Sequence, residues 1–484
     1  MGDFNLILVL PVVCLSSYGL LALLLTPFVR GQSRWLGFVT LVGLAMTGAS
    51  LIELWSSWDV FGPQETAFGM VRVDGFGLFF SFILLLVGVL SVLYSMTFLE
   101  REAADQGEFY ALILLCLAGM FMMLHTTHLI MVLVGLEVFS LALYVLSGLT
   151  RMRLRSVESA MKYFLLGAFS SGFIVYGMAL LYGATGSLDL VRIGAEAASG
   201  PSKMLWIGLG LVLIGLAFKI AAVPFHQWVP DVYQGAPTNV AGFMAAATKT
   251  ATFAVLLRLL VGAFGQHSDV WVPLITWLAI LTMTVANLVA LAQTNLKRLL
   301  AFSSIAHAGY LLIAVVCRPE DGVKAILFYL TAYAFMTVGA FAVLAAAGRG
   351  DAEFERGYEL SDWSGAGWHR PLLGAALSFF LFSLAGLPPT AGFLGKYVIF
   401  QAAVDSERYL LAVVGVLNAA VAAYYYIRVV VTLYMREGDT EALPLPVSPA
   451  TATVLVVSAL GVLYLGLAPG RLLDLVRGLA AALI

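Results

Sequence analysis

Long apolar stretches separated by short polar segments make up most of the chain. Each stretch holds about 20 residues, which is the length that a helix needs to cross a hydrocarbon core of about 30 Å. The strict alternation typical of an outer-membrane barrel is absent, so the pattern predicts an all-α polytopic membrane protein with about fourteen transmembrane helices. The predicted spans cover residues 5–28, 35–55, 75–98, 109–125, 128–149, 158–183, 203–229, 237–262, 270–292, 295–316, 322–347, 371–403, 409–434 and 448–468.

The composition agrees with this prediction. Of the 484 residues, 61% are hydrophobic and 11% are charged, a balance that excludes an ordinary water-soluble domain. The formal net charge of -2 gives no sign of a nucleic-acid partner. Cys14, Cys116 and Cys317 are too far apart in the sequence to predict a disulfide framework or an iron–sulfur site, so we expect them to pack as small apolar side chains.

Lysine and arginine are unevenly divided between the two sets of loops. The loops that follow odd-numbered spans hold more of them, including Lys297 and Arg298. Loops rich in these residues face the cytoplasm, so we expect both termini to lie outside.

Five ionisable residues fall in the middle of predicted spans, where an ionised side chain costs a few kcal/mol. They are Glu137, Lys219, Lys249, His307 and Lys396. Each could instead snorkel to an interface or pair for packing alone. That alternative is weakest for Lys219 and Lys249, which lie too far from either span end for a lysine side chain to reach a headgroup, and it stays open for His307.

Four other residues have positions that allow a simpler explanation. Lys162 and Arg258 lie near span ends, where snorkelling is possible. His125 and His128 stand between two spans, so we expect them at a membrane interface.

A buried lysine suits proton transfer. Burial disfavours its charged form, whereas a nearby carboxylate favours that form, so a shift in their separation changes whether the lysine holds a proton. Glu137 and Lys219 have the charges for such a pair, although the sequence does not say whether they touch.

Two spans are interrupted by proline beside a mid-span lysine. Pro224 follows Lys219, and a pair of prolines beginning at Pro388, preceded by Gly386, comes shortly before Lys396. A proline inside a span removes a backbone donor and breaks the helix. The freed backbone groups need polar partners or water, so both breaks indicate that the interior of the protein is polar or hydrated there.

The two breaks occupy corresponding positions, the fourth span of spans four to eight and the fourth span of spans nine to thirteen. Paired interruptions of this kind indicate an ion site in transporters built from inverted repeats. The hypothesis divides the chain into three N-terminal helices, two five-helix repeats, and a C-terminal helix with its tail. The corresponding ranges are 1–108, 109–262, 270–434 and 435–484.

Four segments closely resemble the subunit N family of the bacterial proton-pumping NADH:quinone oxidoreductase, respiratory complex I. The most specific signal is "DVYQGAP" followed by "KT" in the next span. The segments are "SAMKYFLLGAFSSGFIVYGMALLYG" (159–183), "VPDVYQGAPTNVAGFMAAATKTATFAVLLRLL" (229–260), "TNLKRLLAFSSIAHAGYLL" (294–312) and "SLAGLPPTAGFLGKYVIF" (383–400).

The resemblance implies a fourteen-helix antiporter-like fold with two inverted five-helix repeats and discontinuous helices 7 and 12. It implies that Glu137 and Lys219 form a charge pair, that Lys249 is the central proton carrier, and that Lys396 is the terminal carrier. His307 matches a polar position on the family's central hydrophilic axis.

It further implies no cofactor in this chain, with flavin, iron–sulfur clusters and quinone in partner subunits. The expected partners are the other membrane-arm subunits and the lipid bilayer, in the bacterial plasma membrane. Three alternatives stay open: a cation/proton antiporter subunit, a related ferredoxin- or formate-driven complex, and a structural scaffold. An antiporter with its own sodium site would favour a further deep carboxylate, and Glu137 is the only one found.

Overall fold

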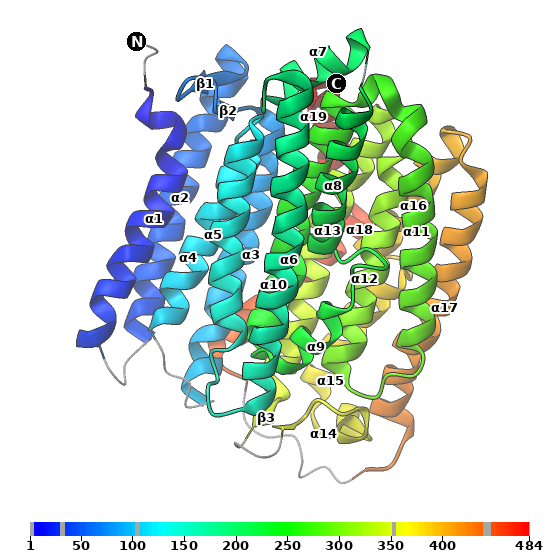
Figure 1. Ribbon diagram of the computed structural model, residues 1–484. Coiled ribbons are helices and arrows are strands. Elements are labelled where there is room, and N and C mark those ends of the chain that lie inside the picture. The colour runs from blue at the N-terminus through cyan, green and yellow to red at the C-terminus, as the bar shows by residue number, and fades with distance from the viewer. Residues whose placement is uncertain are drawn as a thin grey trace.

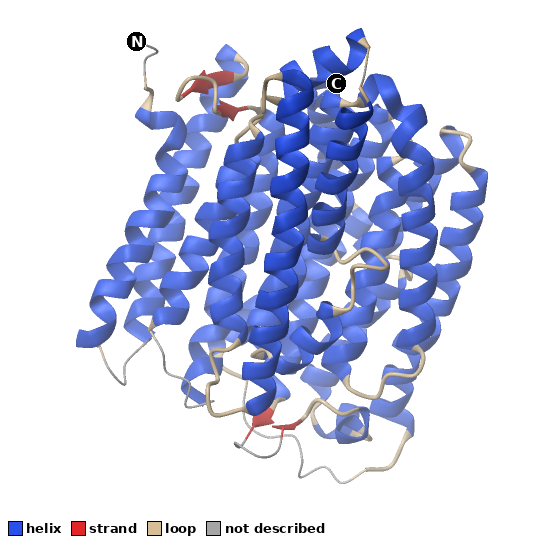
Figure 2. Ribbon diagram, viewed as in Figure 1, coloured by secondary structure: helices blue, strands red, loops and turns tan. Residues whose placement is uncertain are grey.

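The structure, a computed structural model, describes residues 4–29, 34–101, 107–200, 202–350, 355–438 and 447–483. It is built almost wholly of helices (Figure 2). Within these ranges, eleven helices are long and apolar enough to cross a membrane. They are α1 (Leu6–Leu25), α2 (Arg34–Phe61), α3 (Gly75–Arg101), α5 (Leu129–Ser147), α6 (Leu154–Thr185), α10 (Thr238–Leu257), α11 (Ser268–Ala290), α12 (Leu296–Val315), α13 (Pro319–Ala347), α17 (Tyr409–Met435) and α18 (Pro449–Leu467).

Three further spans complete the set that the sequence predicts. One is the single helix α4 (Glu108–Leu124). Each of the others consists of two helices in succession: α8 (Lys203–Lys219) with α9 (Trp228–Gly235), and α15 (Pro371–Ala385) with α16 (Ala391–Asp405). The predicted all-α fold, with interruptions in the seventh and twelfth of about fourteen spans, is confirmed.

The second half of the seventh span extends beyond its predicted end at residue 229. Helix α9 continues to Gly235 although Pro230 lies inside it. Pro230 is the third residue of α9, in the first turn, where a backbone N–H has no partner within the helix, so the proline is tolerated.

Several short elements were not predicted, because each is too short or too polar to register as a span. The helices α7 (Leu190–Ser199) and α19 (Gly470–Leu483) lie at the end of the bundle that holds both termini (Figure 1). The others are η1 (Thr26–Phe28), η3 (Gly265–His267), η4 (Leu360–Trp363), the π-helical turn η2 (Arg258–Ala263), α14 (Ala366–His369), and the antiparallel pairs β1 (Gln64–Thr66) with β2 (Val71–Val73) and β3 (Arg349–Gly350) with β4 (Glu355–Arg356).

The two groups of five spans pack in corresponding ways. Helix α4 packs on α5 as α11 packs on α12, and α5 packs on α6 as α12 packs on α13. The interrupted spans lie against the third span of each group, α6 and α13. They run in opposite directions, because α8 starts from α7 at the end that holds the termini and α15 starts from α14 at the other end (Figure 1). This arrangement agrees with the predicted inverted repeats, whose residue boundaries stay a prediction.

The centre of the bundle is formed by α10, α12 and α13. In their most apolar stretches, 100%, 94% and 89% of the residues are buried, against 28% in α1 and 39% in α17. Outer helices therefore expose apolar side chains to lipid, while charges on the central helices are enclosed by protein.

Glycine pairs permit close contacts between helices. A Cβ placed on Gly119 would lie 2.6 Å from Gly135 O, and one on Gly177 would lie 2.7 Å from Gly208 O. Helices in lipid gain stability from such close backbone approach, so these positions tie α4 to α5 and α6 to α8.

Candidate proton-transfer axis

Glu137 lies on α5 near the middle of the bundle. Its side chain is half-buried, and Ser171 Oγ on α6 donates a hydrogen bond of 2.5 Å to Glu137 Oε1. The sequence did not point to Ser171, because its position opposite Glu137 depends on how α6 packs on α5.

Lys219 is the last residue of α8 and stands directly before the break. Its ammonium donates a hydrogen bond of 2.7 Å to Ser140 Oγ, three residues after Glu137 on α5. Residues three apart share a face of a helix, so Glu137 and Ser140, the partner of Lys219, lie on the same side of α5. Glu137 and Lys219 nevertheless form no ion pair within 4.0 Å, because each is bonded to a different serine.

Four aromatic rings surround the Lys219 ammonium at 5.5–5.9 Å from their centroids. They belong to Phe139, Tyr144, Tyr163 and Phe218. The negative ring faces attract a cation without being charged themselves. They stabilise the ammonium while leaving its net charge uncompensated at close range.

At the first break, residues 220–227, backbone groups find partners other than Lys219. The Ala222 N–H donates to Ala217 O at 2.8 Å, and the Val223 N–H donates to Thr282 Oγ1 on α11 at 3.0 Å. Trp228 Nε1 donates to Phe218 O at 3.1 Å. Lys219 is therefore not needed to saturate the end of α8.

Lys249 lies in the middle of α10, the most buried span. Its ammonium donates to Ser304 Oγ on α12, and Tyr333 OH on α13 donates to the same oxygen at 3.0 Å. The Tyr333 ring centroid is 5.9 Å from the ammonium. No carboxylate pairs with Lys249 among the described residues, so only neutral groups hold its charge.

His307 lies on α12 and is bonded at both ring nitrogens. Nδ1 shares a hydrogen bond with Tyr329 OH, and Nε2 lies 3.2 Å from Tyr426 OH on α17. The Tyr333 and Tyr310 ring centroids are 5.2 and 5.8 Å from that of His307. A histidine with a hydroxyl partner on each side can accept a proton at one nitrogen and release one from the other.

Lys396 lies on α16 and reaches back across the second break, residues 386–390. Its ammonium donates to Leu384 O at 3.0 Å and to Ala385 O at 2.8 Å, the last carbonyls of α15. A cation at this end also interacts favourably with the helix dipole. Gly386 has a φ of +88°, and a Cβ there would lie 3.0 Å from Lys396 Cδ. Lys396 thus caps the break, and Tyr310 lies below it with a ring centroid at 5.1 Å.

The structure brings three of the predicted residues into one connected group. Tyr333 touches both Lys249 and His307, and Tyr310 touches both His307 and Lys396. Glu137 on α5 and Lys219 on α8 lie outside this group and have different hydrogen-bond partners, Ser171 and Ser140. All four cationic candidates are buried, with exposed fractions of 1–5%.

Sequence reasoning missed the tyrosines and serines that connect the charges. One signal was available: Ser303, His307 and Tyr310 recur at helical spacing on α12, as do Tyr329 and Tyr333 on α13. Such spacing places side chains on one face of a helix.

The span-end residues also have definite partners. Lys162 Nζ and Arg298 Nη1 each lie 2.7 Å from the Asp231 carboxylate, which ties α9 to α6 and α12. Lys297, expected in a cytoplasmic loop, is instead buried, and its ammonium donates to Ala236 O at 2.7 Å. The loop position was wrong because Lys297 lies in the first turn of α12, which packs against Ala236 at the end of α9.

Within the described ranges, histidine, cysteine and acidic side chains form no group of three that could hold a metal ion. Cys14, Cys116 and Cys317 are free thiols, two of them buried.

Interrupted spans, each carrying a buried lysine inside a closed helical bundle, define an antiporter-like transmembrane protein. The family described as "NADH:quinone oxidoreductase/Mrp antiporter, TM" matches residues 126–422. The chain belongs to this family, and it is a multi-pass membrane protein.

Individual relatives are similar over nearly the whole chain. NADH-quinone oxidoreductase subunit N of Trichlorobacter lovleyi is 44% identical over 475 residues, which cover 97% of this chain and 96% of the relative. A chain of respiratory complex I from Thermus thermophilus matches with a TM-score of 0.80 and 39% identity, covering 96% of this chain and 98% of that one. The predicted resemblance to the subunit N family is confirmed.

A chain of the Mrp complex from Dietzia sp. DQ12-45-1b has a TM-score of 0.84 at 22% identity, and the match covers 98% of this chain and 97% of that chain. This similarity shows the shared antiporter-like fold alone.

Proposed function

We propose that this chain is a proton-translocating membrane-arm subunit of an NADH:quinone oxidoreductase. Partner subunits would hold the flavin, iron–sulfur clusters and quinone, and this chain would hold no redox centre. The observation that supports the proposal most is the group formed by Lys249, Tyr333, His307, Tyr310 and Lys396, in which each side chain contacts the next. The names of the relatives in Trichlorobacter lovleyi and Thermus thermophilus support partner subunits that transfer electrons from NADH to quinone.

The proposed coupling begins at Glu137 and Lys219. Quinone reduction in partner subunits changes the electric field at this pair. Lys219 is held by one neutral hydroxyl and four rings, so a modest change of field moves its charge relative to Glu137. That movement alters the potential at Lys249, which has no carboxylate of its own and therefore responds by gaining or losing a proton.

Proton transfer then runs from Lys249 toward Lys396. Tyr333 and Ser304 offer hydroxyl oxygens beside Lys249, and His307 follows with hydroxyl partners at both nitrogens. Lys396 receives the proton at the second break. Its ammonium lies against two carbonyl oxygens that favour the charged form, which suits a terminal site that holds a proton until it is released.

The proposal is tested by Lys249→Arg in the native membrane. Arginine keeps the positive charge but does not deprotonate, so it cannot act as a carrier. We expect the complex to assemble and proton uptake into inverted vesicles to be lost during NADH oxidation. Lys324→Arg is the matched control, because Lys324 pairs with Asp321 at 2.9 Å outside the axis. Full pumping by Lys249→Arg would refute the carrier role.

The family also includes Mrp antiporters, and related complexes fed by ferredoxin or formate remain alternatives for the electron donor. Purification of the chain with its native partners separates these functions. Flavin and iron–sulfur absorbance that NADH bleaches would support the proposal. A complex without redox absorbance would favour the antiporter, and one reduced only by another donor would favour a related oxidoreductase.

A further inference from the structure

The segment "DVYQGAP" places one tyrosine, Tyr233, in the second half of the first broken span. It lies in α9, five residues after Trp228, and only 1% of it is exposed. Its ring makes edge contacts with Trp228 and with Phe341 on α13, whose centroids are 6.5 and 6.2 Å away. Tyr233 therefore lies between the first break and the centre of the bundle.

Helix α9 holds Tyr233 firmly. Asp231, two residues before it, lies 2.7 Å from both Lys162 on α6 and Arg298 on α12. A Cβ on Gly235, two residues after it, would lie only 2.4 Å from the backbone of α6. The helix is fixed on both sides of Tyr233, so the hydroxyl group keeps one place relative to α12.

The hydroxyl group of Ser304 on α12 has three polar neighbours. Its oxygen accepts hydrogen bonds from the Lys249 ammonium and from Tyr333 OH, the latter at 3.0 Å. A hydroxyl oxygen has two lone pairs, so these two bonds use both of them. The hydrogen of Ser304 is left to donate, and the third neighbour, the Tyr233 hydroxyl, is the group that takes it.

This arrangement favours the charged form of Lys249. With its hydrogen turned toward Tyr233, Ser304 presents only its oxygen to the ammonium. A neutral lysine has a lone pair on its nitrogen, and Ser304 can donate to that lone pair only by leaving Tyr233. The Tyr233 oxygen therefore stabilises the orientation of Ser304 that suits a charged lysine.

Few other titratable groups face Lys249. Tyr333 on α13 and His307 on α12 interact with it. The other helices packed on α10 carry titratable side chains that form no bond to Lys249 in the described part of the chain, namely Tyr94 on α3, Cys116 on α4, Glu137 on α5 and Lys219 on α8. The state of Lys249 therefore depends chiefly on its contacts through Ser304.

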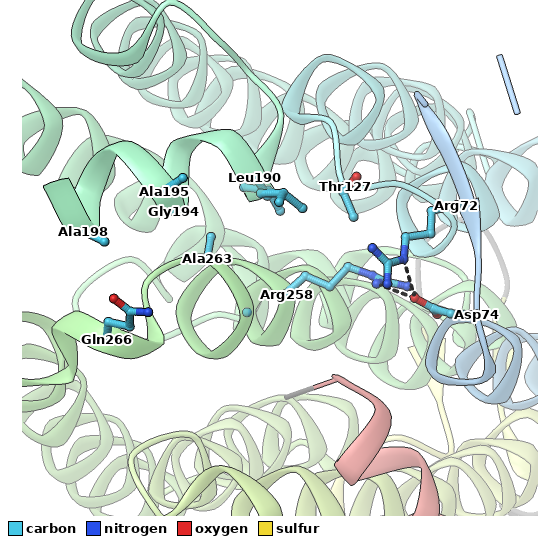
Figure 3. Close-up of a pocket in the computed structure, with 12 residues that line it drawn as sticks. Arg72, Asp74, Thr127, Leu190, Gly194, Ala195, Ala198, Arg258, Ala263 and Gln266 are labelled. Atoms are coloured by element: carbon cyan, nitrogen blue, oxygen red, sulfur yellow. Dashed lines mark hydrogen bonds and ion pairs between the residues drawn. The ribbon is translucent and has the colours of Figure 1, made fainter. Parts of the chain in front are cut away.

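The end of α10 holds an ion pair. Arg258 Nη1 and Nη2 lie 2.8 and 2.7 Å from the two carboxylate oxygens of Asp74 (Figure 3). Only 6% of Arg258 is exposed, so this residue does not snorkel. His125, expected at an interface, is buried near the pair, with Nε2 2.9 Å from Ser81 Oγ. Arg258 lies about 13.5 Å along the helix axis from Lys249, and its charge is compensated there by Asp74.

We propose that Tyr233 is a positioning residue for Lys249. By accepting the hydrogen of Ser304 it favours the charged lysine, and it joins the second half of the first broken span to the group of residues that begins at Lys249. This inference rests on the proposed function and adds a contact to a coupling that otherwise acts through the electric field.

The contact works as a two-position device. When Lys249 passes one proton toward His307, its nitrogen gains a lone pair, and the Ser304 hydrogen turns from Tyr233 to that lone pair. No O–H bond breaks in this turn, so the number of protons is conserved. A shift of α9 that draws Tyr233 away from Ser304 has the same effect as loss of the hydroxyl group and promotes proton release from Lys249.

Tyr233→Phe tests the role of the hydroxyl group, because it keeps the ring between Trp228 and Phe341. The measurement is the number of protons taken up per NADH oxidised, as a function of pH, in vesicles that contain the whole complex. A lysine that binds its proton less tightly loses it at lower pH. We therefore expect the pH above which uptake falls to move down by about half to one unit, the effect of one neutral hydrogen bond.

Tyr333→Phe should move the same pH in the opposite direction. Tyr333 donates to the oxygen that also accepts from Lys249, so the two donors compete for it. Without Tyr333 OH the oxygen accepts more strongly from the ammonium, and uptake should fall only at higher pH, whatever its maximum. A role in packing alone does not move two neighbouring Tyr→Phe variants in opposite directions.

Tyr94→Phe is the matched control. Tyr94 is also 1% exposed, and its hydroxyl group donates to Asn239 O at 3.0 Å at the start of α10, away from Lys249. This variant loses a buried tyrosine hydroxyl that contacts the same helix. We expect its proton uptake to match wild type at every pH.

Ser304→Ala shows whether Tyr233 acts through Ser304. The variant removes the acceptor of the ammonium, so its uptake should also fall at lower pH than that of wild type. Adding Tyr233→Phe to Ser304→Ala should cause no further shift, because residues that act through one contact are not additive. Two shifts that add would contradict the proposed path.

The outcomes separate this inference from the proposed function. If Lys249→Arg fails to pump while Tyr233→Phe follows wild type at every pH, the role of Tyr233 is refuted and the proposed function stands. If Lys249→Arg pumps fully, both fail. If Tyr233→Phe does not assemble, Ser304→Ala decides, since an unmoved pH dependence refutes the role. Shifts of the same sign in Tyr233→Phe and Tyr333→Phe also contradict it.

Discussion

The two helix breaks place a lysine beside proline in the same way, but they use that lysine differently. At the first break, Trp228 and the backbone satisfy the carbonyl groups, and Lys219 turns away to Ser140 and four rings. At the second break, the ammonium of Lys396 itself satisfies Leu384 O and Ala385 O. Lys219 can therefore change its charge without disturbing the break, whereas Lys396 is part of the structure of its break.

This difference agrees with the roles proposed for the two residues. A residue that transmits a change of field must move easily, and four neutral rings impose little directional constraint. A terminal carrier needs a definite place from which to release its proton, and two carbonyl groups at the end of α15 provide one. Under this proposal, a broken helix with a lysine would serve coupling in the first half of the chain and proton retention in the second.

The largest effect is expected for Lys396→Met. The variant should lose pumping and also stability, because two buried carbonyl groups lose their donor at a cost of about 1–3 kcal/mol each. The apparent unfolding temperature of the purified complex and proton uptake by vesicles measure the two effects. Lys396→Arg sharpens the test, since it retains donors but cannot deprotonate: we expect stability near wild type with pumping absent. An unchanged unfolding temperature in Lys396→Met would show that the ammonium does not hold the break.

The next effect is a loss of function with little loss of stability. Lys219→Met removes a buried charge whose hydrogen bond goes to Ser140, and Ser140 still donates to Leu136 O at 2.5 Å. We expect assembly and an unfolding temperature at or above wild type, with quinone reduction and proton pumping reduced together. Lys203→Met is the control, because Lys203 is exposed at the other end of α8. Normal coupled activity in Lys219→Met would remove this residue from the mechanism.

The sequence predicts the features that the membrane imposes. Span lengths follow from the thickness of the bilayer, the breaks follow from Pro224 and Pro388, and the candidate charges stand out because burial in lipid is costly. These predictions need no knowledge of which helices touch. The boundaries of the spans and the short helices were harder to predict from the sequence. Helices α7 and α19 mix polar and apolar residues and are too short to form spans.

The partners of the charges could not be predicted, because they depend on helix packing between distant parts of the chain. Ser304 accepts a hydrogen bond from Lys249 although the two residues are 55 positions apart in the sequence, and Asp74 binds Arg258 across 184 positions. Periodicity indicates which side chains share a face, but not which face of another helix they meet. The site was therefore predictable as a set of charges and not as a connected path.

A smaller effect is expected for Gly386→Ala. Its φ of +88° is one that alanine adopts only with strain, at a cost of about 1–3 kcal/mol, and the new methyl group would lie 3.0 Å from Lys396 Cδ. We expect a lower unfolding temperature and partial loss of pumping, because the ammonium is pushed from the carbonyl groups. Gly210→Ala is the matched control: nothing lies within 4 Å of that position in α8, so stability should be equal or higher. Wild-type pumping in Gly386→Ala would show that Lys396 tolerates displacement.

The smallest effect is expected at the first break. Trp228→Phe preserves a ring for stacking on Tyr163, whose centroid lies 4.4 Å away, but removes the indole donor to Phe218 O. That carbonyl still accepts from the Ala221 N–H at 3.0 Å, so the loss should be only about 0.5–1.5 kcal/mol. Pumping should stay near wild type, because Lys219 does not saturate this break. A loss of pumping as large as that of Lys219→Met would mean that the break and the lysine act as one unit, as they do at Lys396, and the contrast between the two halves would no longer hold.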